Sequence, residues 1–368
     1  MATNVSQPGV YVAETLDADF SVSMGATAVP VFVGDFGNVP AAMTRVNGWR
    51  DAQSLLGSDD SEALNAAQAA LYGYFANGGG AGYVVTTAGR GLKDALAEVP
   101  DDVTIVVAPH LWEQGAQTAG QWARELAAFA AERKAMAILH ADRDHTPEQA
   151  GSAVKAWGIP AAHASFAAVY YPWAQMPRSS DAVAPSAIVA GIWARSDQER
   201  GVWKAPANAA VRGITGLQHT ATDDEQRQFV NINFLRTFKG TGILVWGART
   251  VAADGEAGTW RYIPVRRLVS TVERDLTRAL QFTIFEPNTQ ATWDKCRAAT
   301  ENYLNHIWKQ GGLMGSAPQE AYFVQIGNGI TMTDTDVTAG RMILNIGLAA
   351  VRPAEFITLQ ITTEAGQA

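Results

Sequence analysis

Cysteine is almost absent from this chain of 368 residues, in which Cys296 is the only one. A single cysteine excludes an internal disulfide framework and a zinc site built on cysteines, so we expect a reducing compartment. No apolar run reaches the roughly 18 residues that a membrane span needs. The first thirty residues lack the basic start and apolar core of a secretory signal. We therefore expect a soluble protein that assembles in the cytoplasm.

Charged residues are also scarce. They make up 17% of the chain, whereas hydrophobic residues make up 47%, and the usual charged share is roughly a quarter. Interface cores are poor in Lys, Glu and Asp and rich in aromatic residues. The shortage of charge and the eleven Trp residues therefore fit either surfaces covered by partners or large cores. The net charge of −8 argues against nucleic acid as a ligand.

Patterns that would indicate a cofactor or a catalytic site are weak. The glycine-rich stretch 75–85 follows a predicted helix, precedes a predicted strand and contains no lysine. A phosphate-binding loop has the reverse order, so we interpret the stretch as a flexible turn. No G-x-S-x-G nucleophile elbow occurs, although serines such as Ser152, Ser165 and Ser186 leave a triad assembled in space open.

One short segment, HADRDH, has the composition of a metal site, with His140, Asp142, Asp144 and His145. Such side chains suit several transition metals. The segment lies where a strand ends and a helix begins, and there Asp and His commonly serve turns and caps. We therefore expect no metal site, no cofactor and no enzyme activity.

Strands and helices alternate along the middle of the chain. Strands are predicted over 103–109, 135–141, 165–173 and 242–248, and helices over 120–134, 146–157 and 185–197. This alternation predicts a parallel sheet covered by helices. Before it, strands at 28–34 and 83–87 enclose helices at 49–56 and 61–75, with Ser61 as the predicted N-cap of the second helix.

The last third predicts two helices and two strands. The helix over 265–280 has Leu268, Val272, Leu276 and Leu280 at every fourth position. A second helix covers 290–310, and strands follow at 321–326 and 342–349.

Both ends of the chain predict short strands outside these periodic segments. Residues 10–12 follow Pro8 and Gly9, and five of the eight residues in 355–362 are β-branched or aromatic. Pro353 separates the second strand from what precedes it. A strand with unpaired backbone groups tends to pair with the edge of another strand. The function therefore depends on whether that edge belongs to the same chain or to a neighbouring subunit.

Several long motifs have a counterpart in a known family. They are YYPW (170–173) and the segments 185–208, 242–251, 260–268, 285–293, 311–324 and 351–361, together with PGVYV (8–12) and YVV (83–85). In this order and spacing they closely resemble the tail sheath proteins of contractile phage tails and of related phage-tail-like injection systems. The resemblance covers nearly the whole chain.

The resemblance and the predicted elements together imply an α/β fold (α+β overall). We expect an N-terminal arm (1–20), a β-rich and helical region (21–91), an α/β middle domain (92–252), a C-terminal assembly domain of helices and sheet (259–352) and a C-terminal arm (353–368).

The implied function is mechanical. A subunit of this family polymerises helically around an inner tube, and contraction drives the tube through a target envelope; phage tails, bacteriocins and toxin-delivery devices share this design. Two alternatives remain: a baseplate or cap component of the same machine, or an α/β hydrolase-like enzyme built on the middle sheet.

In this family both arms add strands to sheets of neighbouring subunits, a form of β-augmentation. The donating residues here would be Val10, Tyr11, Val12, Phe356, Ile357, Leu359 and Ile361. The accepting residues would be Tyr322, Val324, Ile326, Ile343, Leu344 and Ile346. Such contacts build helical filaments when they do not close. The implied partners are copies of the chain in stacked hexameric rings, the inner tube protein, and baseplate and cap proteins, with no membrane insertion.

The resemblance also implies one helix that contacts the tube through polar and charged groups. We favour the helix over 290–310, with Asp294, Lys295, Arg297, Glu301 and Lys309. The alternative is the helix over 265–280, with Arg266, Arg267, Arg274 and Arg278. Exposed charge pairs contribute only about 0–1 kcal/mol each, so repeated weak contacts would hold the tube and still release it.

Overall fold

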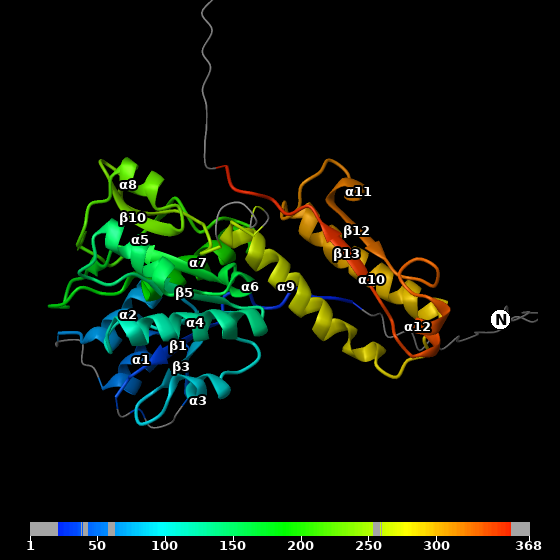
Figure 1. Cartoon of the computed structure of the whole chain (residues 1–368), viewed down its shortest axis with the longest axis horizontal. Coiled ribbons are helices and arrows are strands. Elements are labelled where there is room, and N and C mark those ends of the chain that lie inside the picture. Colours follow the sequence, from blue (N-terminus) through cyan, green and yellow to red (C-terminus); the bar gives the residue numbers. More distant parts are fainter. Residues whose placement is uncertain are drawn as a thin grey trace, which may run out of the picture.

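The computed structural model describes residues 21–354 apart from 38, 40–42, 58–62, 253–257 and 259. The predicted arm strands and Ser61 therefore lie outside the described residues. A large α/β body lies beside a slender C-terminal body, and helix α9 (Ile263–Ala279) runs between them (Figure 1). In the described part of the chain, no helix combines the length and hydrophobicity that a membrane crossing requires.

Nine of the described strands form one sheet in the order β2-β3-β1-β4-β5-β6-β10-β11-β8. Their bounds are β1 (Pro30–Gly34), β2 (Met43–Val46), β3 (Gly82–Thr86), β4 (Ile105–Val107), β5 (Met136–His140), β6 (Ala167–Tyr171), β8 (Ala209–Ala210), β10 (Ile232–Phe238) and β11 (Gly242–Trp246). Neighbouring strands from β3 to β10 run parallel, which confirms the predicted parallel sheet.

The sheet differs from the prediction at its margins. Strands β2, β11 and β8 are antiparallel to their neighbours. The predicted strand 242–248 is antiparallel because residues 239–241 return the chain directly from β10, with Gly240 in the left-handed region at φ +81°. Strand β1 lies between β3 and β4. One sheet therefore contains strands from both sides of the expected boundary between residues 21–91 and 92–252.

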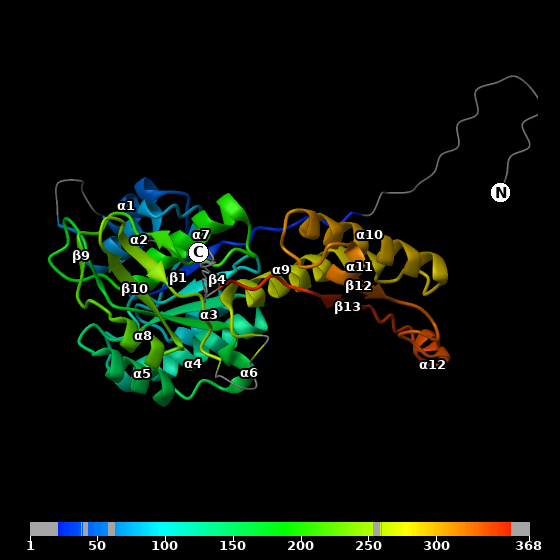
Figure 2. The same cartoon turned by 90° about the horizontal axis from the view of Figure 1, so that it is seen from above.

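Two apolar cores cover the two faces of the sheet, because successive side chains of a strand point to opposite faces. Val31 and Val33 face a core shared with α3 (Leu92–Ala97), α4 (Ala116–Glu132) and α5 (Pro147–Ala156). Phe32 faces the other core, shared with α1 (Trp49–Leu56), α2 (Ala66–Ala76) and α7 (Pro185–Arg200). Figure 2 shows the two helical layers on either side of the strands. Shorter elements complete this body: α6 (Ala161–Ala164), β7 (Ala174–Gln175), β9 (Gly216–Leu217) and α8 (Asp223–Gln228).

The helix starts show how local sequence sets these bounds. Thr146 caps α5 by accepting a hydrogen bond from the Gln149 N–H at 3.3 Å, and Pro147 follows in the first turn, as predicted. Helix α2 begins later than predicted. Its N-cap is Asn65, whose side chain accepts from the Gln68 N–H at 2.9 Å while Gln68 bonds back to the Asn65 N–H.

The glycine-rich stretch forms the predicted turn between α2 and β3. Gly78 has φ +97°, and a Cβ added to Gly79 would lie 2.4 Å from the Tyr74 ring, so both positions require glycine. Asn77 before them is fully buried and bonds through its side chain to the backbone of Gly73 and of Arg212. The turn is therefore anchored to the body through Asn77, while Gly78 and Gly80 are exposed.

The C-terminal body consists of α9 with η1 (Leu280–Thr283), α10 (Gln290–Lys309), α11 (Pro318–Ala321), β12 (Tyr322–Gln325), α12 (Asp334–Thr338) and β13 (Asn345–Leu348). The predicted helices and strands are confirmed, and the strands are shorter than expected. Leu268, Val272 and Leu276 of α9 share a core with Tyr303 and Leu304 of α10.

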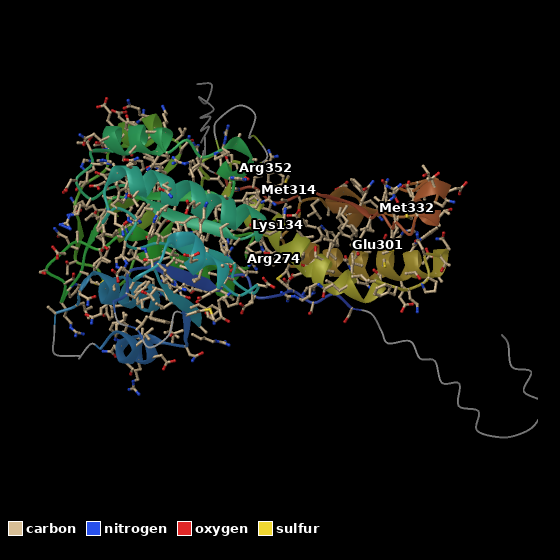
Figure 3. All side chains as sticks on the ribbon, turned by 60° about the horizontal axis from the view of Figure 1, so that its bottom comes forward. Lys134, Arg274, Glu301, Met314, Met332 and Arg352 are labelled. Atoms are coloured by element: carbon tan, nitrogen blue, oxygen red, sulfur yellow. The ribbon has the colours of Figure 1, made fainter. Side chains whose placement is uncertain are left out.

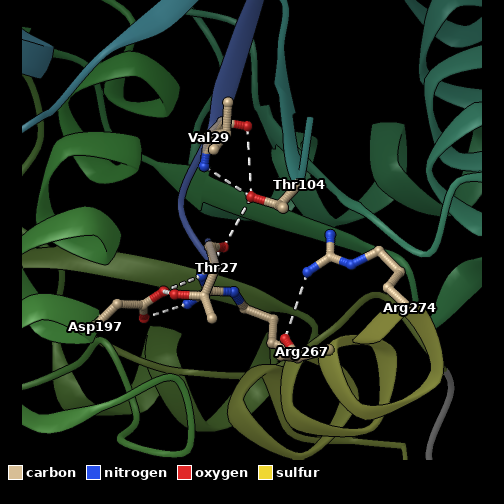
Figure 4. Close-up of polar contacts among 7 residues, drawn as sticks. Thr27, Val29, Thr104, Asp197, Arg267 and Arg274 are labelled. Carbon is tan, nitrogen blue, oxygen red and sulfur yellow. Dashed lines mark hydrogen bonds and ion pairs between the residues drawn. The ribbon is translucent and has the colours of Figure 1, made fainter. Parts of the chain in front are cut away.

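A buried ion pair joins the two bodies. The Arg267 guanidinium of α9 donates to both carboxylate oxygens of Asp197 in α7, at 2.8 and 2.6 Å. Their side chains are only 3% and 5% exposed. The Thr27 hydroxyl also donates to Asp197 at 2.6 Å, and the Thr27 carbonyl accepts from Arg267 at 3.0 Å (Figure 4).

The chain before β1 strengthens this junction. The Thr104 hydroxyl, just before β4, donates to the Thr27 carbonyl and accepts from the Val29 N–H, each at 2.8 Å. Further back, the Gly25 N–H donates to Asp275 of α9 at 3.1 Å. The first described residues therefore run from the C-terminal body across the junction into the sheet.

We expect Asp197→Ala to lower the free energy of unfolding by about 3–5 kcal/mol, because it leaves the Arg267 charge buried and unpaired. Replacing both partners, as Asp197→Leu with Arg267→Met, should be less costly than the single change. Chemical denaturation of the purified chain measures both. The control is Arg227→Ala, which breaks a pair with side chains 74% and 91% exposed and should change stability by less than about 1 kcal/mol. A loss for Asp197→Ala no larger than that of the control would contradict this role.

Candidate interaction surfaces

Within the described residues, the two-stranded sheet of the C-terminal body has open edges. β12 pairs with β13 in antiparallel register, with Phe323 opposite Gly347 and Val324 opposite Ile346. Among the described strands, neither has a second ladder partner. Beyond β13, Ala350 forms an isolated bridge to Leu313. Unpaired edges of this kind are templates for another strand.

The inner face of this sheet rests on the helices. Tyr322, Val324, Ile346 and Leu348 pack against the core of α9 and α10. On the outer face Phe323 is 53% exposed, and its ring lies over Gly347, where an added Cβ would come within 2.0 Å of the ring. The helices therefore support the sheet from one side only.

The predicted accepting residues divide into two groups. Tyr322, Val324 and Ile346 lie in β12 and β13. Ile326, Ile343 and Leu344 lie just outside the strands: Ile326 is fully buried beside Trp293, and Ile343 is 37% exposed. The donating residues of both arms lie outside the described residues, so pairing between arms and strands stays a prediction.

Helix α10 presents a polar side to solvent. Asp294, Lys295 and Lys309 are exposed, and Arg297 and Glu301 are half-buried. Asp294 accepts from the Gln290 side chain at 2.8 Å and lies 3.5 Å from Arg297. Arg297 also donates to the Ile326 carbonyl, so part of its bonding holds the end of β12. The other side of α10 is buried, as predicted from Trp293, Cys296, Tyr303, Leu304 and Ile307.

The alternative helix, α9, offers less surface than its arginines suggested. Arg266 and Arg267 are 6% and 4% exposed, and the Arg266 guanidinium lies 4.1 Å from the Trp260 ring centroid. Arg274 is half-buried, and Arg278 is exposed. The prediction that these arginines form one surface set was therefore wrong for Arg266 and Arg267, because the start of α9 packs against the α/β body.

The HADRDH segment forms a turn. Asp142 accepts from the Asp144 N–H at 2.9 Å, and the His145 carbonyl accepts from the Tyr171 hydroxyl at 2.8 Å. His140 is fully buried, and its ring nitrogens have no hydrogen-bond partner among the described residues. Its ring centroid lies 5.3 Å from that of Trp173. Within the described ranges, no group of three or more His, Cys, Asp and Glu side chains is placed to hold a metal ion.

The three serines that left the hydrolase alternative open all lie in the α/β body. Ser165 and Ser186 are buried, and Ser152 is exposed on α5. Within the part of the chain that the structure describes, none of these three serines bonds to a histidine, which is the contact that activates a serine nucleophile.

Two family models match the chain. The model described as phage tail sheath protein central domain matches residues 86–251, and the model described as phage tail sheath C-terminal domain matches residues 256–364. The boundary between the two matches falls shortly before α9.

Solved structures resemble the chain over its full length. A chain of the PVC sheath complex, from an extracellular contractile injection system in the contracted state, is 42% identical with a TM-score of 0.81, and the match covers 99% of both chains. A chain of the helical sheath of the anti-feeding prophage, also contracted, is 38% identical with a TM-score of 0.79, covering 98% of this chain and 100% of that one.

Curated relatives are more distant. The tail sheath protein of Burkholderia phage BcepMu is 25% identical over 189 residues, which are 49% of this chain and 38% of the relative. The chain matches less than half the length of each curated relative, between 19% and 46%.

We expect the chain to lose stability as the pH falls from 6.5 to 5. Burial lowers the pKa of His140 to about 3, with a further contribution from His110, and burial lowers the pKa of His110 to about 4. Below the ordinary value of about 6.5, the unfolded chain therefore binds protons that the folded chain does not. For each pH unit by which the pH falls, each of the two histidines should raise the equilibrium constant of unfolding by at most about tenfold.

Denaturation curves at several pH values measure this slope. His140→Leu should flatten it, whereas His306→Gln, at an exposed position, should leave it unchanged. An equal slope in the His140→Leu variant would show that this histidine does not carry the effect.

Proposed function

The chain belongs to the phage tail sheath family, and on that basis we propose that it is the subunit of a contractile sheath, which encloses an inner tube and drives it through a target envelope. The observation that supports this most directly is the full-length likeness to chains of two contracted sheaths. The subunit acts by assembly and movement, without catalysis. It assembles in the cytoplasm into a phage or phage-tail-like particle.

Arm exchange through β12 and β13 links the copies. The open edges of this sheet accept the strand of residues 10–12 from one neighbour and the strand of residues 356–361 from another. Backbone hydrogen bonds contribute about 0.5–1.5 kcal/mol each, so one short strand attaches weakly and many repeated strands attach firmly. Each copy gives and receives, and because these head-to-tail contacts do not close, the product is a helical filament of stacked rings.

Contraction moves whole subunits. The buried Arg267–Asp197 pair holds the C-terminal body on the α/β body, so both move as one unit. The segments at 13–20 and 351–353 absorb the change in direction while the exchanged strands stay paired. The extended state is the metastable one, and the contracted state has the lower free energy.

Helix α10 is the contact with the tube. Its exposed charges at Asp294, Lys295 and Lys309 support this choice over α9, where two of the four arginines are buried. Baseplate and cap proteins complete the particle at its two ends.

Electron microscopy of the chain expressed alone tests the assembly. We expect wide hollow tubes with helical striations, in the contracted packing because no inner tube holds them extended. Deleting residues 353–368 should leave a folded, soluble chain that forms no tubes, since the accepting edges receive no C-terminal strand. Deleting only residues 363–368 removes the polar tail and keeps the strand, so tubes should persist. Full-length tubes from the longer deletion would contradict arm exchange, and discrete particles even with the tube protein would contradict the sheath.

The tube contact is tested by charge reversal on α10. We expect Asp294→Lys with Lys309→Glu to reduce co-sedimentation of sheath with tube, and the wild-type complex to weaken with added salt, because exposed charges are screened. The matched control is Arg278→Glu on α9, which should bind the tube normally. The reverse pattern would move the contact to α9.

A further inference from the structure

A cavity of about 890 Å³ opens where the α/β body meets the end of the β12–β13 sheet. Its walls on one side come from α8, the β10–β11 hairpin and the segment after α7, including Trp203 and Trp246. The other side is formed by Gln310, Gly311 and residues 351–354. Figure 3 shows Arg352 at this junction between the two bodies. The cavity therefore adjoins the end of the proposed arm-accepting sheet.

The lining of this cavity is strongly basic. Its charged members are the cations Arg200, Lys204, Arg227, Arg236, Arg249 and Arg352, and the one carboxylate Asp223. Asp223 pairs with Arg236 at 2.7 Å, and outside the lining Asp224 lies 3.4 Å from Arg227. Leaving Arg249 aside and counting both carboxylates, the other five cations exceed the two acids by three, in a chain whose net charge is −8. Such a concentration of one sign attracts an anionic partner.

The positive groups at the entrance are available to a partner. Arg200 and Arg352 are exposed, and Lys204 is half-buried with its ammonium donating to the Ala205 carbonyl at 2.9 Å. The positive charge of Arg200 adds to burial in lowering the pKa of Lys204. A carboxylate bound between two such like charges lowers the repulsion between them.

The chain itself contains an anionic segment of fitting composition. Glu14, Asp17 and Asp19 fall within six residues, and no Lys or Arg precedes Arg45. Glu14 follows the donated strand of residues 10–12 after a single residue. The C-terminal arm is less acidic, with Glu355 and Glu364 separated by eight residues.

We propose that this basic cavity receives the acidic segment 14–19 of a second copy of the chain, next to the edge on which that copy's strand 10–12 pairs. The proposal rests on the arm exchange described above. The cavity lies next to the end of β13. If strand 10–12 of the second copy pairs along β13 and ends toward Ala350, its following residues lie beside Arg352 and the cavity. Backbone pairing attaches the arm, and the carboxylates fix its direction and register.

Charge reversal in the full chain tests this contact. The acidic variant carries Glu14→Lys, Asp17→Lys and Asp19→Lys, and the basic variant carries Arg200→Glu, Lys204→Glu and Arg352→Glu. Each alone should raise the protein concentration needed for tube formation on the order of tenfold. A control with Arg50→Glu and Lys93→Glu, at exposed positions on α1 and α3, should assemble normally. Normal assembly of either reversed variant would overturn the proposal.

Mixing the two reversed variants shows whether the segment comes from the same chain as the cavity or from a second copy. If the contact joins two copies, the unchanged segment of the basic variant can enter the unchanged cavity of the acidic variant. The reversed segment of the acidic variant can likewise enter the reversed cavity of the basic variant. Tubes should therefore return near the wild-type concentration in an equimolar mixture. If the segment folds onto its own cavity, the mixture should stay defective, and only a chain carrying all six changes should recover. That second result would overturn the assignment to a second copy.

A peptide of residues 8–20 tests binding without tubes. Added to the full chain below the concentration at which tubes form, it should change the fluorescence of Trp203 and Trp246, and the change should be lost in high salt and in the basic variant. The matched peptide with Glu14→Gln, Asp17→Asn and Asp19→Asn should bind at least tenfold more weakly. Equal binding of both peptides would overturn the role of charge while leaving arm exchange intact, and tubes absent from the wild-type chain would count against the proposed function alone.

Discussion

The buried pair between Arg267 and Asp197 is the interaction on which the shape of the subunit depends. Either partner without the other would leave an unpaired charge inside the protein. The pair therefore favours one arrangement of α7, α9 and the segment that leads into β1. The same pair fixes the small sheet β12–β13 relative to the large one. A machine that works by moving subunits needs such a fixed relation, because motion within the subunit would absorb the displacement that neighbours must share.

Helix α9 has a double role that follows from this pair. Ile263 and Arg267 near its start belong to the α/β body, and Leu268, Val272 and Leu276 belong to the C-terminal core. The four-residue repeat of apolar positions predicted the helix itself and not the elements that it packs against. The packing of its start on the α/β body depends on which element lies opposite Arg266 and Arg267. The spacing of residues within one helix does not contain this information.

The fold was predictable where local signals and burial agree. Thr146 with Pro147 located α5, and the apolar residues of α10 located its buried side. Strand β10 was missed because Asn233 and Arg236 interrupt its apolar pattern, although Asn233 is buried and bonds to the Val169 and Arg249 carbonyls. The basic cavity was missed for a related reason: its cations come from 200–249 and from Arg352, and only the folded chain brings them together. The strands β12 and β13 were predicted from their sequence, whereas their role as acceptors of an arm came from the family resemblance and stays a prediction.

The margins of the nine-stranded sheet carry a consequence for the fidelity of assembly. One margin is β2, a four-residue strand, and the other is β8, which has only two residues. Short margins offer few backbone groups to a stray strand. In the proposed arm exchange, a donated arm would therefore meet little competition from the large sheet when it pairs with a neighbour. Under the proposed strand exchange, the brevity of β2 and β8 thus works as error suppression, because it limits misdirected pairing.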